Sequence, residues 1–143
     1  MVRFKHRYLV ATVSASPEQI SVMSTKEIAA MLKDSIAENF GDFGAGRTSG
    51  LQEVRSFDRT SGVCIVRAGT DSHRMIRACL TLLSGSKDEP LSVAVEAVTG
   101  CHRTLKGAAI EAYTRGYEQA GLDGATMAAL LQQKEADLDM TER

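Results

Sequence analysis

The sequence is poor in cysteine, proline and aromatic residues, and it has no long apolar run. Its 143 residues include three cysteines, two prolines and no tryptophan, and aromatic side chains make up 5%. A helix that spans a bilayer needs about 18 or more consecutive apolar residues, which this chain lacks. Charges at Arg3, Lys5 and Arg7 stand at the amino terminus without a following apolar segment, which argues against a secretory signal. We therefore expect an intracellular protein with no membrane partner.

The three cysteines also argue against a disulfide framework or a metal site. Cys64, Cys79 and Cys101 are odd in number and widely spaced, with no CxxC pair and no histidine at ligand spacing. Each lies in an otherwise apolar stretch, where a free cysteine behaves as a small hydrophobic residue. We predict three buried, reduced thiols and no metal or other cofactor bound by the protein.

Charge is distributed unevenly along the chain. The net charge of the whole chain is −1, but residues 111–143 carry seven acidic and three basic side chains, a net charge of −4. The first 110 residues therefore carry a net charge of +3. An acidic tail on a mildly basic body is compatible with nucleic-acid binding by the body, although solvated faces of either sign are common.

The first part of the chain predicts a strand, a helix and a loop. Residues Phe4 to Val13 are rich in β-branched and aromatic residues, which is typical of a strand. Ser24 and Glu27 form the pattern of a capping box, and apolar residues then recur at helical spacing. Gly41 is a natural helix stop, and the glycine-rich segment from Gly41 to Gly50 predicts a flexible loop.

The remaining patterns predict a hairpin, a further strand and three more helices. Residues 51–57 and 63–68 flank a short polar turn, as in an antiparallel hairpin. A helix that begins near Thr70 to Ser72 is expected to bury Ile76, Cys79, Leu80 and Leu83. The other predicted elements are a strand over 91–97 and helices over 103–117 and 125–137, the last with an acidic end that frays.

The order β-α-β-β-α-β-α, followed by an extra C-terminal helix, predicts the fold class. We expect an α/β (α+β) sandwich that is RRM-like or ferredoxin-like, with a four-stranded antiparallel sheet, helices on one face and the extra C-terminal helix. Residues 1–120 would form this domain, and residues 121–143 the C-terminal helix and acidic tail. A fold of this kind does not by itself specify a function.

Catalytic motifs are not found. Asp42-Phe43-Gly44 spells the metal-binding tripeptide of protein kinases, but the chain is far too short for a kinase and lacks the other kinase motifs. No Walker loop or dinucleotide-binding glycine pattern is present. His6, His73 and His102 are too scattered in sequence to indicate a metal pair. We therefore predict no catalytic residue on the protein.

Two basic clusters are candidate nucleic-acid contacts. The first comprises Arg3, Lys5, His6, Arg7 and Tyr8, whose charges suit phosphates and whose ring suits a base. An equally good explanation is an edge strand, on which charges deter aggregation. The question stays open at the level of the sequence.

The second cluster is Gly100-Cys101-His102-Arg103 with Lys106. If a helix begins near residue 101, its backbone donors and positive end lie beside Arg103 and Lys106, which favours a phosphate site. Gly100 would let a nucleic-acid backbone approach closely. The alternative is a solvated helix start, but cations there are unfavourable without an anion.

The aromatic residues do not fit a standard RRM. Neither central strand of the hairpin matches the aromatic RNP1 pattern, so bases are not expected to stack across the sheet. Recognition of backbone and shape fits the sequence better.

Several segments of the sequence resemble those of a known family. Met1-Val2-Arg3-Phe4-Lys5-His6-Arg7-Tyr8-Leu9 closely resembles the start of the small protein-subunit family of ribonuclease P and ribonuclease MRP, eukaryotic type (the Pop-five/Rpp-fourteen group). Residues 34–44, 60–67 and the segment with Gly100, Arg103 and Lys106 resemble further family segments in the same order. The resemblance spans about residues 1–117. The family's late Gly-Thr-Ile-Arg segment reads Gly100-Cys101-His102-Arg103 here, so its threonine and isoleucine are replaced.

The resemblance implies a function and partners. Such a protein is a non-catalytic RNA-binding subunit that braces the catalytic domain of the particle's RNA, which with Mg2+ cleaves the 5′ leader of precursor tRNA. The MRP particle processes ribosomal RNA. The implied partners are the ribonuclease P/MRP RNA, a TIM-barrel-like protein subunit and other particle proteins, with precursor tRNA nearby, in the nucleus and nucleolus. The candidate RNA-binding residues are then Arg3, Lys5, His6, Arg7, Tyr8, Arg47, Gly100, Arg103 and Lys106.

Two other functions remain open. A protein-protein adaptor would use the apolar helices over 105–117 and 127–131 to dock a partner and would make no direct RNA contact. A small metabolite-binding or enzymatic domain would need a polar-lined pocket, for which the sequence offers no motif.

Overall fold

The computed structural model describes residues 5–50, 52–85 and 87–141. A four-stranded antiparallel sheet with the strand order β2-β3-β1-β4 forms the centre of the molecule. This order confirms the predicted ferredoxin-like sheet. The strands are β1 (His6–Ser14), β2 (Gln52–Phe57), β3 (Val63–Gly69) and β4 (Ser92–Thr99). The helices are α1 (Pro17–Val22), α2 (Thr25–Thr48), α3 (His73–Thr81), α4 (His102–Gln119) and α5 (Gly124–Thr141).

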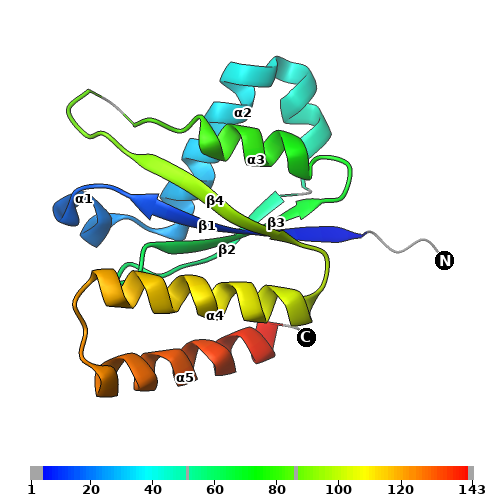
Figure 1. The fold of residues 1–143 in the computed structure, drawn as a ribbon. Coiled ribbons are helices and arrows are strands. Elements are labelled where there is room, and N and C mark those ends of the chain that lie inside the picture. The colour runs from blue at the N-terminus through cyan, green and yellow to red at the C-terminus, as the bar shows by residue number, and fades with distance from the viewer. Residues whose placement is uncertain (1–4, 51, 86, 142–143) are drawn as a thin grey trace.

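Helices cover both faces of the sheet (Figure 1). Helices α2 and α3 pack on one face, against Leu9 and Val66, as the sequence predicted. The opposite face is covered by α4 and α5, which corrects the expectation of helices on one face only. The physical reason is that β1 and β3 are apolar on both sides, since Val10 and Ile65 point away from the first core and would otherwise be exposed.

Helix α2 begins as predicted but ends later. The Ser24 hydroxyl accepts a hydrogen bond from the backbone N–H of Glu27 at 3.4 Å, as in the expected N-cap. Gly41 interrupts the helix with a left-handed φ of 63°, yet the chain then resumes a helical path to Thr48. The predicted loop over residues 41–50 is therefore wrong for 42–48. Tertiary packing explains this, because Thr48 is buried and Gly44 lies against Met75 of α3.

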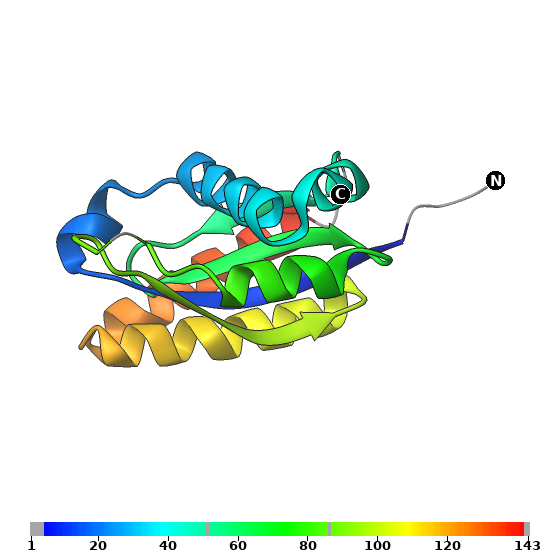
Figure 2. The ribbon, with the colours of Figure 1, turned by 90° about the horizontal axis from the view of Figure 1, so that it is seen from above.

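Helices α2 and α3 lie side by side over the sheet (Figure 2). The Ser35 hydroxyl joins them by donating a 3.0 Å hydrogen bond to the carbonyl of Cys79. Ile76, Cys79 and Leu80 are buried as predicted, and Leu83 is partly buried against the same core. Helix α1 was not predicted, because it is a single short segment that starts at Pro17 and buries no residue.

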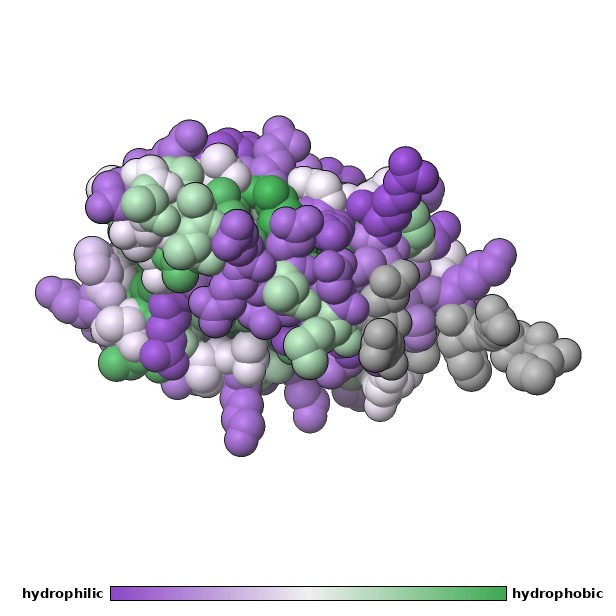
Figure 3. Space-filling view, turned by 90° about the horizontal axis from the view of Figure 1, so that it is seen from below, coloured by the Kyte–Doolittle hydropathy of each residue, from purple (hydrophilic) through white to green (hydrophobic). Residues whose placement is uncertain are grey.

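Helix α5 packs against α4 on the second face of the sheet. It remains helical to Thr141 and buries Leu138, so the expected fraying of the acidic end is contradicted. Seen from below, the outer face over α4 and α5 is mainly hydrophilic, with small apolar patches (Figure 3). Within the described part of the chain, no helix is long and apolar enough to cross a membrane.

The cysteines follow the prediction at two of three positions. Cys64 and Cys79 are buried and unpaired by disulfides, as expected. Cys101 is exposed, which contradicts its predicted burial. It lies beyond the end of β4 as the N-cap residue of α4, where the chain leaves the core.

Candidate nucleic-acid interface

One end of the sheet brings together the basic segments of the chain. Strand β1 begins there, since His6 pairs with Gly69 of β3 and Tyr8 pairs with Thr99 of β4. The backbone N–H and the hydroxyl of Thr70 both donate to the carbonyl of Lys5, at 3.2 and 2.8 Å. The starts of β1, α3 and α4 therefore lie at the same end, on the right in Figure 1. We call this region the basic end; its cations are Lys5, Arg7, Arg74 and Arg103.

Arg7 lies directly against Gly100 and so joins the two clusters found in the sequence. A Cβ atom on Gly100 would be 3.0 Å from Nη1 and 3.3 Å from Cζ of Arg7. The Arg7 Nη1 also donates to the carbonyl of His6 at 3.3 Å. The glycine therefore lets the guanidinium group approach the backbone between β4 and α4, in a position that the sequence alone did not reveal.

The explanation of the first cluster as a protected edge strand is wrong. Strand β1 pairs on one side with β3 and on the other with β4, so it is a central strand. Lys5 is exposed, whereas His6, Arg7 and Tyr8 are half-buried. Because a central strand has no free edge to protect, edge protection cannot account for the charges. Arg3 of the same cluster lies outside the described residues.

Helix α4 begins at His102, close to the predicted start. Its N-cap residue Cys101 makes no side-chain hydrogen bond to the helix backbone, and the first turn contains no acidic residue. The positive end of the helix is therefore not compensated locally by a carboxylate. Arg103 is exposed in this turn, so backbone donors and a guanidinium group lie close together, which is the chemistry that binds phosphate.

Lys106 differs from the other candidates because α5 neutralises it. Its Nζ lies 3.0 Å from Asp139 Oδ1 and 3.2 Å from Glu135 Oε1. Hydrogen bonding to Asp139 and then Glu135 raises the pKa of Lys106 above its ordinary value. The acidic tail thus acts on the body of the protein, holding one of its predicted RNA-binding cations.

Helix α3 adds basic residues that sequence reasoning missed. Arg74 and Arg77 are exposed on the outer side of α3, and His73 lies at its start. The Nδ1 atom of His73 is 2.6 Å from the carbonyl of Thr70, the residue that binds Lys5. The sequence contained a signal for this cluster, because Arg74 and Arg77 stand on either side of the buried Ile76. Nothing in the sequence showed that α3 begins beside β1.

Arg47 lies in the last turn of α2, at the edge of this region. Its side chain is exposed, and its Cζ atom is 6.0 Å from the centre of the Phe43 ring. Because the chain is helical again after Gly41, Phe43 and Arg47 lie on the same side of this last part of α2.

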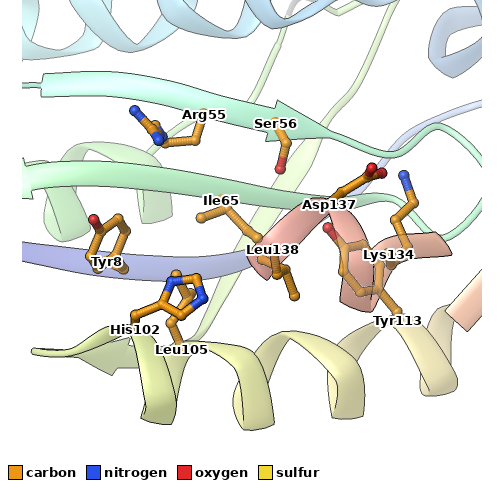
Figure 4. Close-up of a pocket in the computed structure, with 10 residues that line it drawn as sticks. All are labelled: Tyr8, Arg55, Ser56, Ile65, His102, Leu105, Tyr113, Lys134, Asp137 and Leu138. Carbon is orange, nitrogen blue, oxygen red and sulfur yellow. The ribbon is translucent and has the colours of Figure 1, made fainter. Parts of the chain in front are cut away.

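The sheet face that an RRM would use for bases is closed in this protein. A cavity of about 80 Å3 remains between the sheet and helices α4 and α5, with Tyr8, Ile65 and Leu138 in its wall (Figure 4). A cavity of about 150 Å3 is known to take benzene, so this one is too small for a nucleobase. The geometry agrees with the expectation that bases do not stack across the sheet.

Within the described ranges, no group of three or more His, Cys, Asp or Glu residues could hold a metal ion.

The exposed Cys101 is the most reactive thiol, because a hydrogen bond with the Thr104 hydroxyl lowers its pKa. The opposite holds for Cys64, where burial raises the pKa to about 12.

Comparison with known proteins identifies relatives. The model of the "Rpp14/Pop5 family" matches residues 7–110. A "Probable ribonuclease P/MRP protein subunit POP5" of Arabidopsis thaliana is 27% identical over 126 residues, 83% of each chain. A "Ribonuclease P/MRP protein subunit POP5" of Schizosaccharomyces pombe is 30% identical over 122 residues, covering 78% of this chain and 87% of the relative.

A similar fold occurs in a chain of a cryo-EM structure of yeast ribonuclease MRP. The TM-score is 0.55 at 11% sequence identity, and the match covers 72% of this chain and 79% of that chain. At this identity the similarity shows the fold alone.

Proposed function

This chain belongs to the Rpp14/Pop5 family, and from that premise we propose that it is a protein subunit of the ribonuclease P/MRP ribonucleoprotein. Its role is to bind the particle's RNA and stabilise the catalytic domain of that RNA. In ribonuclease P this supports 5′ maturation of precursor tRNA, and in ribonuclease MRP it supports processing of ribosomal RNA. The names of the plant and fission-yeast relatives support membership of both particles.

The observation that carries the RNA-binding role is the contact of Arg7 with Gly100 at the basic end. It assembles cations from the start of β1 and the start of α4 into one surface, beside backbone donors of α4. Phosphate groups that come close together in a tightly folded RNA repel one another, and bound cationic side chains reduce this repulsion. Each phosphate that a cation neutralises also releases counterions, which favours binding.

In this proposal the protein supplies no catalytic group. Cleavage is carried out by the RNA with Mg2+, and the protein binds no cofactor of its own. A TIM-barrel-like subunit and other particle proteins are the expected protein partners, with precursor tRNA nearby. The expected location is the nucleus and nucleolus.

The adaptor alternative loses part of its basis in the structure. It required the apolar sides of 105–117 and 127–131 for docking a partner. Leu105 and Tyr113 are buried, and Met127, Leu130 and Leu131 pack against the same core. These side chains are already used to hold α4 and α5 on the sheet.

The proposal is tested by the salt dependence of RNA binding. We would change Lys5, Arg7 and Arg103 together to Ala and measure affinity for ribonuclease P RNA over a range of salt concentrations. The expected result is weaker binding and a slope of log affinity against log salt that is flatter by up to about three units. The matched control changes three exposed lysines elsewhere, namely Lys26, Lys33 and Lys87.

The control variant should keep most of the affinity, since its lysines lie away from the basic end. Equal losses in the two variants would mean that only net charge matters and would reject a specific phosphate surface. Protein without RNA should not cleave precursor tRNA. Cleavage by the protein alone would reject the non-catalytic role.

A further inference from the structure

Phe43 is the most exposed aromatic side chain among the large apolar residues of the described chain, with 71% of its surface accessible. It lies in the short helical segment that follows Gly41. Leaving a phenyl ring in water gives up the favourable free energy that its burial would contribute. Its position therefore invites an explanation beyond the stability of the isolated protein.

The exposure is enforced by the packing of the residues around it. A Cβ atom on Gly44 would overlap Phe40 and would lie 3.4 Å from the sulfur of Met75 in α3. Four residues later, the Thr48 side chain is buried and bonded to the Gly44 carbonyl. One side of the segment is thus held firmly against α3, and Phe43 is on the side that faces outward.

Arg47 is the partner of Phe43 on this outward side. The two residues are one helical turn apart, and the Arg47 Cζ is 6.0 Å from the ring centre. A guanidinium group at this distance from an aromatic face is attracted to it, which restrains both side chains. The pair presents a ring and a planar cation next to each other.

The pair also borders the basic end. Gly44 contacts Met75, whose neighbour in α3 is the exposed Arg74. Arg47 and Arg74 are both exposed, and the acid nearest to Phe43 in sequence is the exposed Asp42. A ring bordered by cations suits a ligand that is planar and attached to phosphate.

We infer that Phe43 and Arg47 form a stacking platform for an unpaired nucleobase of the bound RNA. The base stacks on the phenyl ring, and Arg47 contacts its face or the adjacent phosphate. This site rests on the proposed function and extends it, since it recognises a base outside the sheet face, which α4 and α5 close. Stacking of this kind is tolerant of base identity because every base has a π face.

The test uses two single-stranded RNA probes of equal length and charge, a 12-residue oligoadenylate and its abasic counterpart. Binding of full-length protein is measured by fluorescence anisotropy at fixed salt. Wild-type protein should bind oligoadenylate about five-fold or more tightly than the abasic strand. Phe43→Leu, which keeps an apolar side chain but removes the ring, should abolish this preference, and Phe43→Trp should retain it.

Leu82→Ala is the matched control, because Leu82 is also an exposed apolar residue, with 57% of its surface accessible. It should leave the preference for oligoadenylate unchanged. Persistence of that preference in Phe43→Leu overturns the inference. A second outcome also overturns it: Phe43→Leu binds the oligonucleotides as wild-type protein does but no longer retains a protein partner that survives nuclease treatment. Phe43 would then dock a protein.

The site and the proposed function can fail separately. If wild-type protein binds both probes equally but binds ribonuclease P RNA through Lys5, Arg7 and Arg103, the platform is rejected and the function stands. If wild-type protein binds neither the probes nor ribonuclease P RNA, both are rejected.

Discussion

The hydroxyl of Tyr117 donates a 2.8 Å hydrogen bond to Oδ2 of Asp58, and so ties α4 to the turn between β2 and β3. The same carboxylate oxygen accepts a 2.6 Å hydrogen bond from the Ser61 hydroxyl. Tyr117 is fully buried, and burial, followed by the bond to Asp58, raises the pKa of its phenol above the ordinary value. This polar link holds the C-terminal part of α4 against the turn.

Replacing Tyr117 by Phe should lower the free energy of unfolding by about 1.5–3 kcal/mol, because the lost hydrogen bond involves a charged acceptor. Urea denaturation at neutral pH measures the change, which should appear as a lower midpoint with an unchanged slope. Tyr8→Phe is the control, since Tyr8 is half-buried and packs against the same apolar cluster as Tyr117 but is not bonded to Asp58. A similar loss in both variants would show that the bond to Asp58 is not the cause.

Gly116 should not tolerate a side chain, whereas Gly107 of the same helix should. A Cβ atom on Gly116 would lie 2.5 Å from the carbonyl oxygen of Ser61, and one on Gly107 would meet nothing within 4 Å. Gly116→Ala should therefore destabilise the protein by about 1–3 kcal/mol through overpacking. Gly107→Ala should stabilise it by about 0.4–1 kcal/mol, because alanine reduces the freedom of the unfolded chain. Thermal unfolding of the two variants measures both changes in stability. A stabilised Gly116→Ala would contradict the close packing of α4 on the turn.

Release of Lys106 from α5 should strengthen RNA binding. Glu135→Gln combined with Asp139→Asn removes both carboxylates that contact its Nζ. We expect tighter binding to ribonuclease P RNA and a salt dependence steeper by about one unit, because one more cation can neutralise a phosphate. Stability should change little, since these ion pairs are exposed.

The control for this variant is Glu111→Gln with Glu118→Gln, which alters net charge equally on the exposed side of α4. Salt screens charges that lie farther from the bound RNA, so the control should have a smaller effect. An equal gain in affinity would indicate a general effect of net charge and not the release of Lys106.

The three thiols should differ in their reactivity toward alkylating reagents. Cys101 is exposed and has a lowered pKa, whereas burial raises the pKa of Cys79 and raises that of Cys64 to about 12. Because the thiolate is the reactive form, iodoacetamide at neutral pH should modify Cys101 alone in folded protein. Mass spectrometry of the adducts checks this result.

The alkylation rate of Cys101 should depend on pH in a predictable direction. A lowered pKa means that the Cys101 thiolate forms at a lower pH than an ordinary thiol, so its alkylation rate should reach a plateau earlier as the pH rises. Thr104→Val removes the hydroxyl that lowers this pKa and should shift the plateau to higher pH. An unchanged profile would show that the Thr104 contact does not stabilise the thiolate.

The sheet and its helices were largely predictable because local patterns carry their information. The capping residue Ser24, the hairpin around residues 58–62 and the buried positions of α3 each follow from residues close in sequence. The segment after Gly41 was not predictable in the same way. Its glycines favour a loop, and it is helical because Gly44 packs against Met75 of α3 and Thr48 is buried.

The residues of the candidate interface were also predictable in part, whereas their contacts were not. Lys5, Arg7 and Arg103 could be singled out from charge and spacing, but their juxtaposition through Gly100 depends on the pairing of β1 with β4. The capture of Lys106 by α5 required the position of a helix whose acidic end was expected to fray. Contacts between distant segments determine which of the predicted cations remain available.

The central position of β1 has a consequence for biosynthesis. This strand leaves the ribosome before its pairing partners at Val63–Gly69 and Ser92–Thr99, which are translated later. Arg7 therefore cannot contact Gly100 until β4 and the residue that follows it have been made. A nascent chain stalled before β4 carries Lys5 and Arg7 without Gly100, so the surface that we propose to bind RNA forms only after β4 and the residue that follows it have been made.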